Sequence, residues 1–126
     1  MWKPYRLRKT WDFQKIIEQK NKIINYQFLI FYLPNQIANC RFGITIPKKI
    51  VKKAVERNLY KRQIKNMLIL WIKESGCLEI ENFHYDLVII MRNSYTDKDF
   101  QHNQKILVSS LNYIVKKEKN QNLKYG

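Results

Sequence analysis

The sequence predicts an α+β fold, a two-layer sandwich in which helices pack against one mixed sheet. Short runs rich in aromatic and β-branched residues alternate with longer runs whose apolar residues recur every three or four positions. These runs follow the order helix, two or three strands, long helix, strand, helix, which is typical of an α+β domain. The 126 residues include only three glycines and three prolines, so no flexible linker divides the chain and we expect one domain.

The first predicted element is a short helix near the N-terminus. Thr10 is a residue type that caps helix N-termini, and we expect the helix to run to about Lys20. Phe13, Ile16 and Ile17 would then lie on one side of it and form its apolar face.

The next predicted elements are strands. Residues 26–33 (YQFLIFYL) have a strand composition with two apolar faces, so both faces must be covered. Residues 40–46 (CRFGITI) predict a further strand, and Ile23-Ile24 can add a short one before both.

A long helix is predicted from Lys48 to about Lys73, a segment without glycine or proline. We expect Gly76 to end it. Its apolar line follows helical spacing: Tyr60, Ile64, Met67, Leu68 and Trp71.

The last two predicted elements are an inner strand over residues 83–91 (FHYDLVIIM) and a final helix opened by a capping box at Thr96–Asp99. Residues from Lys116 onwards are polar, and we expect them to fray. We therefore place the single domain at residues 1–117 and a polar C-terminal tail at 118–126. The buried stripe of the final helix would be Phe100, Leu107, Leu111 and Ile114.

The charge balance is the first indication of function. There are 24 Lys and Arg against 10 Asp and Glu, a formal net charge of +14. A compact domain with this charge repels itself unless a polyanion balances it, and nucleic acid is the commonest polyanion. An anionic membrane surface is the alternative, although the longest apolar runs, 28–33 and 67–72, are far too short to span a bilayer. No secretory signal is recognisable, and Cys40 and Cys77 are expected to be free thiols, so we expect a cytoplasmic protein.

The positive charge concentrates in residues 41–65, which hold one acid, Glu56. Lys53, Arg57, Lys61 and Lys65 are spaced by four and would share one helix face, where like charges destabilise an isolated helix unless a polyanion lies along it. A solvated face is the alternative, but such faces usually mix both signs. The basic residues of the segment are Arg41, Lys48, Lys49, Lys52, Lys53, Arg57, Lys61, Arg62 and Lys65.

Aromatic residues allow two interpretations. Most of these residues are expected in the core, but a cleft with basic walls and an aromatic floor would suit single-stranded nucleic acid. The aromatic residues concerned are Phe13, Phe28, Phe31, Tyr32 and Phe42. Enzyme motifs are absent: there is no phosphate-binding glycine loop, no nucleophile elbow and no zinc-ligand cluster. We therefore predict no catalytic residue and no metal site in this chain.

Residues 53–62 (KAVERNLYKR) resemble the K-A-V-x-R-N-R-x-K-R signature of the bacterial ribonuclease P protein component. Arg41–Lys49 (RFGITIPKK) supplies the strand and P-K-K turn that precede this signature in the family. Weaker matches are Arg6–Lys9, Asn25–Phe28 and Asp86–Arg92, so the resemblance spans roughly residues 5–117.

The resemblance implies an αβββαβα fold with a left-handed crossover, like the second domain of ribosomal protein S5. It implies two partners, the ribonuclease P RNA and precursor tRNA, with the protein a monomer within a ribonucleoprotein. The RNA would use Mg²⁺ to hydrolyse precursor tRNA and release the mature 5′ end, and the protein would hold no cofactor of its own. Chemistry would belong to the RNA, and the protein would assist it.

The resemblance also implies two sets of site residues. The RNA-binding set is Lys48, Lys49, Lys53, Arg57, Asn58, Lys61, Arg62 and Lys65. The cleft for the 5′ leader would be lined by Arg8, Phe13, Ile17, Phe31 and Arg41. The chain departs from the family pattern at Leu59 and Lys65, where Arg is usual, and at Ile17, where an aromatic residue is common.

Other functions remain open from the residues alone. A ribosomal protein or RNA chaperone with a basic α+β fold would bind RNA without promoting 5′ maturation. A stand-alone nuclease would cleave RNA by itself, and a membrane-surface protein would bind anionic vesicles.

Overall fold

The computed structural model confirms the predicted class and order of elements. It describes residue 7 and residues 10–18, 21–34, 40–81, 85–93, 95 and 99–125, with the backbone alone at 10–13, 75–81 and 117–125. Over this part of the chain, three helices and four strands alternate in αβββαβα order. They are α1 (Thr10–Ile17), β1 (Lys22–Ile24), β2 (Phe28–Pro34), β3 (Arg41–Thr45), α2 (Ala54–Glu81), β4 (Tyr85–Met91) and α3 (Phe100–Tyr125).

The four strands form one mixed sheet in the order β1-β2-β4-β3. The inner strand β2 runs antiparallel to β1 and to the other inner strand, β4, whereas β3 and β4 are parallel neighbours joined through α2. This crossover places the chain that follows β3 and the chain that follows β4 at the same end of the sheet.

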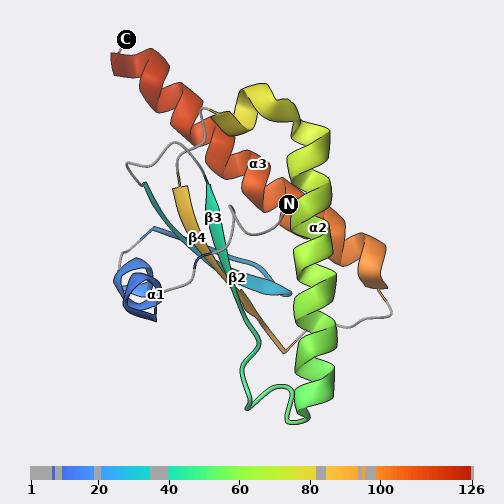
Figure 1. Cartoon of the computed structure of the whole chain (residues 1–126). Coiled ribbons are helices and arrows are strands. Elements are labelled where there is room, and N and C mark those ends of the chain that lie inside the picture. The colour runs from blue at the N-terminus through green and yellow to red at the C-terminus, as the bar shows by residue number, and fades with distance from the viewer. Residues whose placement is uncertain are drawn as a thin grey trace.

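Both faces of the sheet are covered, as the two apolar faces of β2 require. Figure 1 shows α2 and α3 on one side and the short helix α1 on the other. The main core lies under α2 and α3, where Phe28, Phe42 and Leu87 meet side chains such as Ile64 and Leu111. A smaller cluster lies under α1 and contains Leu7, Ile16, Phe31 and Val88. Because α1 is short, it covers only part of its face.

Helix α2 begins and ends later than predicted. Residues 48–50 form a turn in which the amides of Ile50 and Val51 both donate to the Pro47 carbonyl, each at 3.0 Å, and the helix begins at Ala54. Gly76 does not end the helix, which continues to Glu81 and bends in its last turns (Figure 1). Packing of the preceding turns against the core outweighs the local preference of one glycine, and a Ser-Gly pair permits such a bend.

Two other boundaries differ from the sequence prediction. Helix α1 ends at Ile17, earlier than Lys20. Helix α3 extends to Tyr125, so the backbone of residues 118–125, expected to fray, is helical. Lys, Glu, Gln and Leu are good helix formers, and they prolong a helix that the buried Leu107 and Leu111 have already anchored. The short strand at Ile23-Ile24 is present as part of β1, and Thr96–Lys98 of the predicted capping box lie outside the described residues.

Cys40 lies in the main core just before β3. Burial raises the pKa of its thiol from the ordinary value of 9.0 to about 12. The thiol therefore stays protonated at neutral pH, as is usual for a buried structural cysteine. The side chain of Cys77 lies outside the described residues.

Candidate nucleic-acid interface

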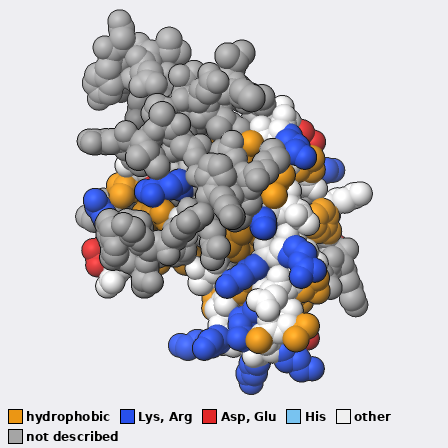
Figure 2. Space-filling view, viewed as in Figure 1, with side chains coloured by type: hydrophobic (Ala, Val, Ile, Leu, Met, Phe, Trp, Pro, Cys, Tyr) orange, Lys and Arg blue, Asp and Glu red, His pale blue; other side chains and the backbone are white. Residues whose placement is uncertain are grey.

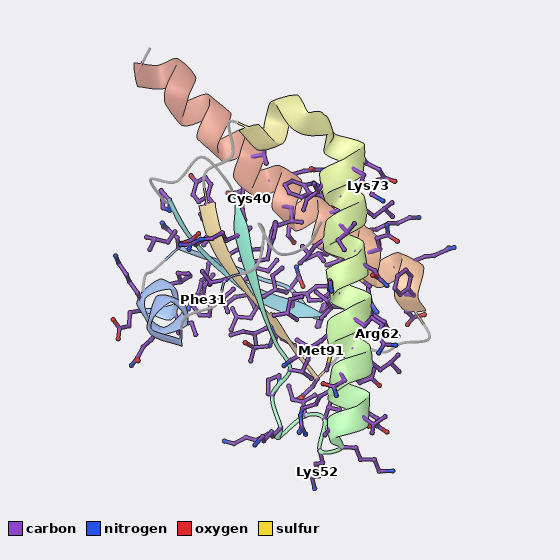
Figure 3. The ribbon with its side chains drawn as sticks, viewed as in Figure 1. Phe31, Cys40, Lys52, Arg62, Lys73 and Met91 are labelled. Atoms are coloured by element: carbon purple, nitrogen blue, oxygen red, sulfur yellow. The ribbon has the colours of Figure 1, made fainter. Side chains whose placement is uncertain are left out.

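A basic loop connects β3 to α2, and we use this name for residues 47–53 (PKKIVKK). Its backbone is pinned by the two hydrogen bonds to the Pro47 carbonyl and by the side chain of Val51, which is buried in the main core. The four lysines of the loop, Lys48, Lys49, Lys52 and Lys53, are all exposed. Figure 3 shows Lys52 projecting from the end of the molecule where α2 begins.

The first turns of α2 continue this positive surface. Asn58, Lys61 and Arg62 are exposed, and Lys65 is half-buried. In Figure 2 the blue Lys and Arg side chains gather over the lower part of α2 and the basic loop. Within the described residues, no carboxylate pairs with the lysines of the basic loop, with Lys61 or with Arg62.

The predicted ridge of four cations on one helix face is present in part, because Arg57, Lys61 and Lys65 lie on α2 at intervals of four residues. Lys53 precedes the helix, and Arg57 is turned back toward the basic loop. The Arg57 Nη1 donates to the carbonyls of Val51 at 3.0 Å and Lys52 at 2.7 Å. The late start of α2 causes both differences, because it replaces the first predicted turn with a loop that needs its carbonyls satisfied.

The sheet face under α1 is divided into three rows by the strand register. The middle row of Phe31, Val88 and Gly43 is buried, and Ile16 of α1 belongs to the same apolar cluster. A second row contains Leu33, Asp86 and Arg41.

A third row contains Ile24, Leu29, Ile90 and Thr45, all of which are partly or largely exposed. The third row therefore forms an accessible apolar floor beside α1, and we call it the floor row.

Arg41 is held by an acid on this face. Its Nε donates to Oδ1 of Asp86 at 2.8 Å and its Nη2 to Oδ2 at 2.6 Å, a two-point pair with a buried carboxylate. The pair carries no net charge. The Arg41 side chain is therefore half-buried and fixed by this pair, and it adds less positive potential to this face of the sheet than a free cation would.

The leader-cleft residues expected from the sequence have different environments. Phe31 is only 9% exposed and lies between the sheet and α1 (Figure 3). Ile17, on α1, is 41% exposed. The side chain of Phe13 and all of Arg8 lie outside the described residues. The floor row was not predicted. Alternation along a strand places Leu29 on the same face as Phe31, but the sequence does not show which strands lie beside β2.

The floor row ends close to the basic loop. Thr45 pairs with Ile90, so the chain leaves β3 for the basic loop beside the point where it leaves β4 for Arg92. Arg92 is exposed, and its Nη1 donates to the Asn25 carbonyl at 2.7 Å. Tyr26, next to Asn25, is 78% exposed. The guanidinium of Arg92 and the exposed ring of Tyr26 therefore lie at this end of the sheet. Neither residue was predicted from the sequence to belong to the site.

Asn25 connects the turn between β1 and β2 to other elements through hydrogen bonds. Its Oδ1 accepts from the Phe28 amide at 2.8 Å, and its Nδ2 donates to Ser110 Oγ of α3 at 3.0 Å. With the Arg92 contact, this side chain and its carbonyl join the turn to β2, β4 and α3.

A metal site or a small-molecule pocket would be the alternative to a nucleic-acid interface. Among the described residues, no group of three or more His, Cys, Asp or Glu side chains could hold a metal ion. A shallow apolar hollow between α2 and α3, about 240 Å³ in volume and lined in part by Leu70, Lys73 and Phe100, offers no acid, base or nucleophile pair. Nor does any helix in this part of the chain combine the length and apolar character needed to cross a membrane. The described surface combines exposed cations, on the basic loop and the start of α2, with the apolar floor row.

Comparison with known proteins agrees with this geometry. A sequence profile of the Ribonuclease P family matches residues 1–117. The ribonuclease P protein component of Mycoplasmopsis pulmonis is 37% identical over 105 residues, covering 83% of this chain and 86% of the relative. That of Streptococcus agalactiae is 33% identical over 111 residues, covering 88% and 94%.

Solved structures are similar as well. The RNase P protein of Staphylococcus aureus superposes with a TM-score of 0.67 at 29% identity, covering 85% of this chain and 94% of that one. The RNase P protein of Thermotoga maritima gives a TM-score of 0.68 at 25% identity, covering 84% and 94%. The basic loop, the cation-bearing start of α2 and the mixed sheet thus occur in a chain that belongs to the ribonuclease P protein family.

Proposed function

We propose that this protein is the RNA-binding subunit of a cytoplasmic ribonuclease P, acting as one protein copy within the ribonucleoprotein. Its partners are the ribonuclease P RNA and precursor tRNA, and the RNA carries out the Mg²⁺-dependent hydrolysis that removes the 5′ leader. The observation that supports this most directly is the surface of exposed cations on the basic loop and the start of α2, in a chain of this family.

The physical role of that surface is to neutralise crowded phosphates. Each Lys or Arg that meets a phosphate displaces a condensed counterion, so binding weakens steeply as salt rises. Arg62 offers a planar fork for phosphate oxygens, and the lysines of the basic loop act as point charges. Protein cations placed this way lower the Mg²⁺ concentration that the folded RNA needs.

Reconstitution tests the proposal directly. Cleavage of precursor tRNA by the ribonuclease P RNA is measured at low and high Mg²⁺, with and without the protein. We expect the protein to raise cleavage strongly at low Mg²⁺ and little at high Mg²⁺. RNA binding without any gain in cleavage would indicate a general RNA-binding protein instead. Cleavage by the protein alone would indicate a nuclease, and either result contradicts the proposal.

We propose further that the 5′ leader passes over the floor row beside α1, between the Arg41–Asp86 pair and the Arg92 end of the sheet. The floor is aliphatic at Ile24, Leu29 and Ile90, so it would contact bases and sugars by apolar burial and discriminate weakly among leader sequences. Exposed cations at its end would meet leader phosphates.

Ile24 gives a clean test of the leader path because it is 56% exposed and contributes little to the core. Ile24→Ala is expected to weaken binding of leader-bearing precursor tRNA to the holoenzyme by about threefold to tenfold, from the apolar area lost. Binding of mature tRNA should not change. The matched control is Tyr113→Ala, an equally exposed apolar residue on α3, which should affect neither RNA. Equal weakening of both RNAs by Ile24→Ala would place the leader elsewhere.

A further inference from the structure

Arg57 differs from the cations around it. Whereas Lys53, Lys61 and Arg62 are exposed, Arg57 is half-buried, and one of its amino groups is committed to the protein's own backbone. Both N–H bonds of Nη1 are used, one for the Val51 carbonyl and one for the Lys52 carbonyl. The Nε and Nη2 edge remains available for a phosphate, so Arg57 differs from its neighbours in that it also holds the protein's own backbone.

The two carbonyls that Arg57 binds lie in the second half of the basic loop. The first half is tied by the Pro47 carbonyl, and the middle is anchored by the buried Val51 side chain. Among the described contacts, Arg57 is the side chain that ties the backbone of Val51 and Lys52 to α2. Without the Arg57 side chain, the Val51 and Lys52 carbonyls would hydrogen-bond to water instead. The backbone at Lys52 and Lys53 would then have fewer contacts that fix its position.

We propose that Arg57 is a positioning residue that holds the basic loop in the conformation in which its lysines meet RNA phosphates. A lysine has a flexible side chain, so its ammonium is placed accurately only if the backbone below it is fixed. Holding the loop before binding removes an ordering cost that the complex would otherwise bear. This inference rests on the proposed RNA-binding function for its consequence, but the conformation of the loop can be measured without RNA.

The first test uses the free protein. Limited trypsin digestion reports the conformation of the loop, because its four lysines are cleavage sites that a pinned backbone protects. Arg57→Lys and Arg57→Ala are expected to speed cleavage at residues 48–53 by about fivefold or more at a temperature where both variants remain folded. The matched control Arg62→Ala removes an exposed guanidinium and should digest like the unaltered chain. Unchanged digestion in both Arg57 variants would overturn the proposal.

The second test uses RNA affinity and separates positioning from direct contact. Arg57→Lys keeps the charge but loses the two hydrogen bonds to the Val51 and Lys52 carbonyls. We therefore expect this variant to bind ribonuclease P RNA nearly as weakly as Arg57→Ala does. If Arg57 were a simple phosphate contact, Arg57→Lys would keep the charge and therefore the salt slope of the unaltered chain, and Arg57→Ala would lower that slope by only about 1. That pattern would refute the positioning role.

Combination with a loop variant completes the test. Once Lys52 and Lys53 are replaced by alanine, Arg57→Ala should cost much less affinity than it does in the unaltered chain, whereas the cost of Arg62→Ala should be the same in both backgrounds. Full additivity for Arg57 would contradict the proposal. If the unaltered chain binds no RNA at all, the proposed function fails, and the digestion result still decides whether Arg57 holds the loop.

Discussion

Replacing all four lysines of the basic loop with alanine is expected to reduce affinity for the ribonuclease P RNA by about three orders of magnitude at about 0.1 M salt. The variant combines Lys48→Ala, Lys49→Ala, Lys52→Ala and Lys53→Ala. If each lysine meets one phosphate, the slope of log affinity against log salt becomes shallower by about 3 to 4. Titration of labelled RNA at several salt concentrations measures both quantities. Protein stability should change little, because all four side chains are exposed and have no described carboxylate partner.

A control of equal charge separates position from net charge. It replaces four exposed lysines outside the basic loop and the start of α2: Lys15, Lys73, Lys105 and Lys116. Its net charge equals that of the loop variant, so a long-range effect would appear in both. We expect it to lose less than about tenfold in affinity, because exposed charges more than a Debye length from the RNA are screened. An equal loss in the two variants would mean that overall charge, and not the basic loop, determines binding.

The second large effect is expected at Trp71, which fixes α2 to the rest of the fold. Its side chain is 2% exposed, and its ring lies edge-on to that of Phe42 with centroids 6.4 Å apart. Its Nε1 donates to Asn112 Oδ1 at 3.0 Å, so one residue of α2 contacts both β3 and α3. Trp71→Ala should lower the free energy of unfolding by about 4 kcal/mol, measured by urea denaturation.

The same substitution should weaken RNA binding, although it removes no cation, because looser packing of α2 against the sheet would leave the cations at its start less well fixed. Trp71→Phe is the matched control: it keeps an aromatic ring but loses the N–H group. We expect it to cost about 1–2 kcal/mol, including the hydrogen bond lost by Asn112. A loss of less than about 1 kcal/mol for Trp71→Ala would show that this contact is not what secures α2.

The elements of the fold were predictable because their signals are local. Strand composition in residues 26–33 and the apolar line from Tyr60 to Trp71 identify β2 and α2 without knowledge of what covers them. Boundaries were less accurate where a long-range contact competes with a local preference. Gly76 predicts the end of a helix, but the packing of α2 carries the helix past it, and the Pro47 turn delays its start to Ala54.

The positive surface was predictable for the same reason, since its cations are close together in the sequence and hydrophilic enough to stay exposed. The sequence alone therefore determined that this is a basic α+β protein with its cations gathered around the β3–α2 connection. The binding role of those cations stays a proposal until RNA affinity is measured.

Only the tertiary structure decided what each of these residues contacts. The floor row takes Ile24, Leu29, Ile90 and Thr45 from four different strands, and their alignment depends on strand register. Arg41 meets Asp86, and Arg57 turns back to the basic loop. Periodicity and composition describe neighbours along the chain, whereas strand pairing and hydrogen-bond partners are selected by how distant segments pack. For this reason the sequence locates the charge, and the packing decides which cations remain free.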